Sequence, residues 1–178
     1  MGLGGFAHLS DFVREGGVLA AFGNSGTLAV DGGLVRNVRR ASVGSTPGSI
    51  LRAKVLRPQH PIAYGYESST TIFRGNDPMW DVDDEDRGWA VVQFGTKEVP
   101  EPEDKEKGKE SKKETGPLVL SGFAKDPDKV DGKPAILDLP VGKGRVVLYA
   151  FNPFHRYLNH ADFRYAYNLI LNWNDVPQ

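Results

Sequence analysis

Histidines are the side chains of this sequence best suited to acid–base or metal chemistry, and there are four: His8, His60, His155 and His160. A helical zinc pair needs ligands about four residues apart, so that both rings face the same way. His155 and His160 are five residues apart, which does not fit this spacing. Pro153 also disfavours a position for His155 within a helix. The HExxH pattern is absent, as is the HxxE-plus-distant-His pattern of zinc carboxypeptidases. These histidines therefore predict surface or capping roles, with no metal bound by this chain.

His60 precedes Pro61, which holds its backbone in an extended conformation. One interpretation places its ring at the edge of a cleft as an acid or base. The other makes it a turn histidine bonded to nearby backbone. No serine or carboxylate stands at a recognisable partner spacing, which favours the second interpretation and leaves the first open.

Three further motifs resemble chemical sites only in part. The acidic run at 81–86 lacks the glycine and glutamate that an EF-hand loop requires, so it predicts a solvated loop. The sequence GKGR at 142–145 lies between two predicted strands, which indicates a hairpin and not a phosphate loop. Ser25 has Gly23 two residues before it, but Thr27 stands where a nucleophile elbow has its second glycine. No catalytic residue is assigned.

Composition narrows the possible partners. Lys plus Arg number 22 and Asp plus Glu number 23, a balance that predicts neither nucleic acid nor an anionic membrane as a partner. The absence of cysteine excludes disulfides and cysteine nucleophiles.

No stretch of the sequence approaches the ~20 apolar residues that a membrane-spanning helix needs. The first residues show no basic and apolar pattern of a signal peptide, so we expect no targeting signal in this chain.

The elements that must position these residues begin with a helix. Apolar residues recur at three- and four-residue spacing from Leu3 to Val13, and Gly16 and Gly17 end the pattern. Residues 18–22 then predict a buried, central parallel strand, followed by a turn at 23–26. A helix, a glycine pair and a strand form the second half of a βαβ unit, whose first strand the sequence lacks.

The rest of the chain predicts a mixed sheet and a final helix. Strand candidates are 50–56, 70–73, 89–94, 135–139 and 145–151, the last two forming an antiparallel hairpin. A helix over 160–173 carries one apolar stripe of five residues, with Leu169 at its flank: Phe163, Ala166, Tyr167, Ile170 and Trp173. Most residues of segment 97–115 are charged and none is aromatic, so we expect an exposed, flexible insert within a single domain spanning 1–178.

Six short segments in this order resemble one family: FVREGG at 12–17, PGSIL at 47–51, HPIAYGY at 60–66, LSGF at 120–123, GKGRVV at 142–147 and NP at 152–153. Together they resemble the C-terminal region of large bacterial proteins of the zinc carboxypeptidase (carboxypeptidase A-like) family. That region is a class I glutamine-amidotransferase-like domain with a flavodoxin-like fold. The resemblance implies an α/β mixed sheet with flanking helices, here expected to lack its first strands.

The resemblance also implies a role. Amidotransferases use a cysteine nucleophile, which this chain lacks, and no residue matches the peptidase's zinc ligands. It therefore implies a non-catalytic accessory domain of a larger, secreted or periplasmic metallopeptidase-like protein. Zinc would belong only to the peptidase domain of that parent, and that domain would be the partner.

An alternative remains open: a small hydrolase or carbohydrate-binding domain that uses a crevice at the strand ends. Its candidate lining is His60, Tyr64, Tyr66, Asn152 and His155. Under the accessory interpretation we expect instead an open sheet edge beside residues 18–22. Such an edge predicts self-association or an exposed apolar strip near the N-terminus.

Overall fold

The computed structural model describes residues 2–97 and 116–176, which form an α/β structure. The helices are α1 (Leu3–Arg14), α2 (Gly26–Asp31) and α3 (His160–Leu171). The strands are β1 (Val18–Phe22), β2 (Val38–Arg40), β3 (Ser49–Val55), β4 (Ser69–Arg74), β5 (Trp80–Val82), β6 (Ala90–Phe94), β7 (Val119–Ser121), β8 (Pro134–Val141) and β9 (Gly144–Tyr149). Short 3₁₀ turns connect them: η1 (Gly23–Ser25), η2 (Pro61–Ala63), η3 (Asp84–Trp89), η4 (Pro127–Lys129) and η5 (His155–Tyr157).

The main sheet has the strand order β1-β9-β8-β6-β3-β4, with β7 also paired to β3. Only β1 and β9 run parallel, from Val18 opposite Arg145 to Phe22 opposite Tyr149. The other pairs of this sheet, and the small β2–β5 sheet, are antiparallel. The expected mixed α/β class is confirmed, and so is the parallel direction of β1. Its expected central position is wrong, because β1 lies at one end of the strand order.

The predicted hairpin is present as β8 and β9, which pair from Ile136–Tyr149 to Val141–Gly144. Gly142 turns the chain with a φ of +64°. A Cβ on Gly144 would lie 2.1 Å from the Val13 carbonyl oxygen and 2.2 Å from that of Gly17. Only glycine therefore lets this end of the hairpin approach the end of α1.

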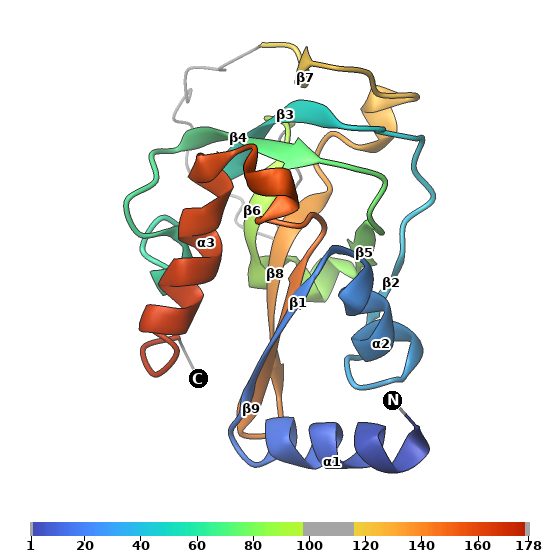
Figure 1. The fold of residues 1–178 in the computed structure, drawn as a ribbon, viewed down its shortest axis with the longest axis vertical. Helices are drawn as coiled ribbons and strands as arrows, with labels where there is room; N and C mark the ends of the chain where they lie inside the picture. The colour runs from blue at the N-terminus through green and yellow to red at the C-terminus, as the bar shows by residue number, and fades with distance from the viewer. Residues whose placement is uncertain (1, 98–115, 177–178) are drawn as a thin grey trace.

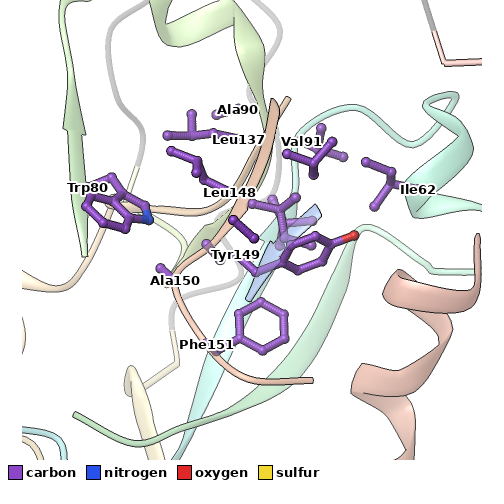
Figure 2. Packing of buried hydrophobic residues seen from close by; sticks show 14 of the residues in the cluster. Ile62, Trp80, Ala90, Val91, Leu137, Leu148, Tyr149, Ala150 and Phe151 are labelled. Carbon is purple, nitrogen blue, oxygen red and sulfur yellow. The ribbon is translucent and has the colours of Figure 1, made fainter. Parts of the chain in front are cut away.

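The hydrophobic core fills both faces of the central strands. Leu137, Leu148 and Tyr149 from the hairpin pack with Val91 from β6 and Ile62 from η2, all fully buried (Figure 2). Every residue of β6 and β9 is buried, which explains why these strands are nearly continuous apolar runs.

Helix α1 does not cover the sheet as the βαβ interpretation expected. It lies across the ends of β1 and β9 (Figure 1), where the amide of Lys143 donates to the carbonyl of Arg14. Val13 is its one buried residue, whereas Leu3 and Phe12 remain exposed. With β1 at the sheet edge, α1 packs at the hairpin end through Val13 and beside Gly32 at the end of α2 through Phe6. Of the expected apolar strip near the N-terminus, Phe6 and Leu9 are half-buried and Leu3 and Phe12 are exposed.

Some elements were not predicted from sequence. Strands β2, β5 and β7 each span three residues, too few to establish an alternating pattern. The run 81–86, expected to be a solvated loop, instead begins in β5, where Asp81 pairs with Lys133. The expected charged insert at 97–115 lies outside the described residues except for Lys97. None of the helices in the described ranges is long and apolar enough to cross a membrane.

Candidate functional site

His60, the first candidate of the expected crevice, belongs to a buried polar network. Its Nε2 lies 2.8 Å from Oδ2 of Asp138, and both side chains have no exposed surface. Arg145 reaches the same carboxylate, with Nε 2.7 Å from Oδ1 and Nη2 2.8 Å from Oδ2. On the other side of the ring, Nδ1 accepts a hydrogen bond of 3.3 Å from the amide of Ile62.

These contacts fix the protonation of the network. Because Nδ1 accepts from an amide, the proton of a neutral His60 lies on Nε2 and points at Asp138. Burial raises the pKa of Asp138, but hydrogen bonds from His60 and Arg145 outweigh it and leave that pKa below its ordinary value. The network joins η2 to the β8–β9 hairpin, and with no exposed surface its imidazole cannot meet a substrate.

Tyr64 and Tyr66, the next two candidates, attach helix α3 to the segment after η2. The Tyr66 ring stacks on Tyr165, with centroids 3.9 Å apart, and its hydroxyl donates to the carbonyl of Ala161. The carbonyl of Tyr64 accepts from Nδ2 of Asn168 at 2.8 Å. Burial raises the pKa of Tyr66, which keeps its hydroxyl protonated and donating.

Asn152 and His155 lie in the turn that follows β9. Oδ1 of Asn152 accepts from the amide of Phe154 at 3.0 Å, and the His155 ring stacks on Phe73 of β4 at 5.0 Å. The contacts of the five candidates thus join η2, the segment after it, α3 and the turn after β9 to one another. None of the five lines any of the three main cavities of the described chain.

The other chemical motifs are engaged locally. Oγ of Ser25 donates to the carbonyl of Phe22 at 2.9 Å, which occupies the hydroxyl that a nucleophile elbow would need free. Within the described residues no group of three or more histidine, aspartate or glutamate side chains could hold a metal ion.

A cavity of about 370 Å³ lies between the sheet and η4, with charged residues on its wall. Several of those charges have partners, and Arg87 and Lys129 pair with Asp84 and Asp126 outside the wall. Lys133 pairs with Asp81, and Oδ1 of Asp131 accepts from the amide of Lys97. The buried Gln93 donates to the carbonyl of Lys97 at 2.8 Å.

Asp162, which no sequence motif singled out, is a second buried acid. Its Oδ2 accepts from the amide of Phe73 at 3.0 Å, whereas Oδ1 has no hydrogen-bond partner among the described residues. Burial raises its pKa to about 7. The contact attaches the first turn of α3 to β4.

The most distinctive surface feature is apolar. Helix α3 buries Tyr165, Ala166 and Leu169, but leaves Tyr167 and Ile170 52% and 60% exposed. Trp173, just beyond the helix, is 54% exposed. Of the five residues of the predicted stripe, Phe163 and Ala166 thus lie in the core, and Tyr167, Ile170 and Trp173 lie on the surface.

This exposed stripe runs beside the open edge of β1. At one end, the Phe154 ring lies 5.8 Å from both Phe22 of β1 and Tyr167 of α3. At the other end, Phe12, Val18 and Trp173 line a shallow hollow. We call these residues, together with the exposed Ile170 of α3, the edge surface: Phe12, Val18, Phe154, Tyr167, Ile170 and Trp173.

Comparisons with protein-family models, with curated proteins and with solved structures found no match to this chain. The site therefore has to be interpreted from its own geometry.

Proposed function

We propose that this chain is a non-catalytic interaction domain that binds another polypeptide through the edge surface. One observation carries the proposal: an apolar stripe with the periodicity of a core helix face is exposed beside a strand that has one neighbour among the described strands. Contiguous exposed apolar patches of this kind mark interaction sites.

Two physical terms favour occupation of this surface. Burying a large apolar side chain stabilises a complex by roughly 1.5–3 kcal/mol before the costs of association. The unpaired backbone groups of an edge strand add hydrogen bonds to any extended segment that lies beside them. Both terms act along the same line, since α3 and β1 lie side by side at this edge.

The alternative, a hydrolase or carbohydrate-binding domain, needs a crevice that gathers His60 and His155. His60 does meet a carboxylate, but in a position with no exposed surface. His155 stacks on Phe73 of β4, whereas His60 pairs with Asp138 of β8. These placements favour the interaction role.

The sequence resemblance suggests a particular partner, the peptidase domain of a larger secreted metallopeptidase-like protein, where the zinc would also reside. The parallel β1–β9 pair, with a glycine turn after β1, is the part of the sheet that fits the proposed flavodoxin-like, amidotransferase-like arrangement. The remaining pairs of the main sheet are antiparallel, whereas a flavodoxin-like sheet is parallel.

Site-specific photo-crosslinking tests the interaction role. A benzophenone amino acid at position 170 should give a discrete adduct with a polypeptide in intact producing cells, and mass spectrometry identifies that polypeptide. The matched control is position 171, which is 78% exposed and points away from the buried face of α3. Failure to form any discrete adduct at 170 would contradict the proposed role.

A further inference from the structure

The open edge of β1 presents a defined set of backbone groups. The carbonyl of Gly17 accepts from Arg145, and the amide of Gly23 donates to Phe151, so odd-numbered residues face β9. In a strand, alternate residues point their backbone groups in opposite directions. Val18, Ala20 and Phe22 therefore direct their amides and carbonyls outward, where no described strand pairs with them. The Phe22 carbonyl already accepts one hydrogen bond from Oγ of Ser25, so a pairing strand would use its second lone pair.

The same three residues place their side chains on the face covered by α3. The Phe22 ring contacts Tyr149 at 4.8 Å, and the Tyr149 hydroxyl donates to the carbonyl of Tyr165 in α3. Because alternate side chains of a strand lie on the same face of the sheet, Val18 and Ala20 lie on this face together with Phe22. A strand added beside β1 would accordingly lie under the exposed stripe of α3.

We propose that this added strand is β1 of a second copy of the chain, paired antiparallel about a two-fold axis at Ala20. The proposal rests on the interaction role above and specifies its partner. Each outward-facing residue then meets another: Ala20 meets its own copy, and Val18 meets Phe22. Such pairs exchange two hydrogen bonds each in an antiparallel ladder.

The shape of the edge surface is complementary to itself under this operation. Phe154 stands at the Phe22 end of the strand, and the hollow lined by Phe12 and Trp173 lies at the Val18 end. A two-fold axis at Ala20 brings the aromatic knob of each copy toward the hollow of the other. In an isologous contact, a feature on one copy meets a different feature on the other copy, and the same contact is repeated with the two copies interchanged.

Charge also permits self-pairing. A two-fold contact places like charges near each other, and neither β1 nor the stripe carries a charged side chain. Glu15 is the one charged residue lining the hollow, and the proposed pairing brings it toward Phe154 of the other copy and not toward a second Glu15. Edge strands that avoid pairing usually carry charges or proline. The opposite edge, β4, has Ser69, Thr70 and Thr71 in its sequence and ends on Arg74, whereas β1 reads Val-Leu-Ala-Ala-Phe.

The test is the molar mass of the full chain as a function of concentration, measured by sedimentation equilibrium. We expect a monomer–dimer equilibrium for the unchanged protein. Ala20→Pro removes one outward-facing amide and leaves the β1–β9 bonds intact, since proline is tolerated at an edge. We expect it to weaken the dimer by about tenfold or more, because it removes a symmetric pair of hydrogen bonds and adds a steric block.

Ile170→Lys provides a second disruption that does not involve the backbone. It puts two like charges near the two-fold axis and should weaken the dimer by a similar factor, whereas the control Leu171→Lys should leave the dissociation constant within about twofold. Circular dichroism establishes that each variant is folded.

The outcomes separate the two proposals. A protein that stays monomeric at all concentrations, but crosslinks from position 170 to a different polypeptide, overturns the homodimer and retains the interaction role. A monomer that forms no adduct from position 170 overturns both. A dimer that responds equally to Ile170→Lys and Leu171→Lys uses another surface and also overturns this inference.

Discussion

Asp138 illustrates how a single polar residue in an apolar strand acquires a structural role. It stands in the middle of β8, where its neighbours are all buried, and its partner His60 lies 78 residues earlier. A carboxylate in this position would be costly without partners, and Arg145 and His60 supply them. A lone acid within an apolar strand is the sequence signal that could have identified this network.

Removing the acid should therefore destabilise the protein strongly. Asp138→Asn removes the buried negative charge that His60 and Arg145 share, and we expect the free energy of unfolding to fall by about 3–5 kcal/mol in urea titrations. The control is Asp83→Asn, which breaks the exposed pair with Arg39 and should leave the unfolding midpoint nearly unchanged. Equal effects of the two substitutions would contradict the structural role of the network.

Asp162 should make stability depend on pH. Burial raises its folded pKa to about 7, above the ordinary value of 3.8, so the folded state holds this proton more tightly than the unfolded state. This contribution to stability is complete below the unfolded pKa and is lost as the pH rises through about 7.

The measurement is the difference in unfolding free energy between Asp162→Asn and the unchanged protein, from pH 4 to pH 8. The asparagine can still accept from the Phe73 amide but does not titrate. We expect the variant to gain relative stability as the pH rises, by up to about 4 kcal/mol, since one pKa unit corresponds to about 1.4 kcal/mol. A difference that does not change with pH would show that Asp162 titrates normally.

At the scale of elements, α3 shows what an apolar pattern can and cannot establish. The spacing of Phe163, Ala166, Tyr167 and Ile170 correctly predicted a helix. It did not predict which half of the stripe would be buried. The buried face is rotated toward Tyr165 and Leu169, because Tyr165 stacks on Tyr66 and receives the hydroxyl of Tyr149 at its carbonyl. Periodicity indicates an apolar face without indicating what covers it.

At the junction of α1 with the β8–β9 hairpin, the backbone at Gly144 lies against the backbone at the end of α1, and a substitution can test this contact. Gly144→Ala would place a methyl group 2.1 Å from a carbonyl oxygen, so the backbone must move. We expect a loss of about 2 kcal/mol or more, in the range of other strained substitutions.

The matched control is Gly4→Ala in α1, where an added Cβ meets nothing within 4 Å. Because alanine favours helix more than glycine does, this substitution should stabilise the protein slightly, by up to about 1 kcal/mol. Thermal unfolding measures both variants. A stability loss for Gly4→Ala would show that α1 is packed more tightly than its exposure indicates.

At the scale of the whole molecule, the sequence predicted most elements but not their arrangement. Strands β3, β4, β6, β8 and β9 were each recognisable from runs of β-formers. The position of β1 was not, because an apolar strand has the same composition whether its second neighbour belongs to the same chain or to another. The partners of the candidate residues were missed for a related reason, since Asp138 and Phe73 are distant in sequence from His60 and His155.

The segment 97–115 offers the last prediction, which rests on composition. A run so rich in charge and without aromatic residues has little apolar surface to bury, so it should contribute little to stability. We expect replacement by a short Gly/Ser linker to leave the unfolding midpoint nearly unchanged, because the entropy of loop closure varies only slowly with length. It should also leave the dissociation constant of the proposed dimer unchanged, since no residue of the edge surface belongs to this segment. A loss of several kcal/mol would mean that the segment packs against the domain, and a weaker dimer would place it at the interface.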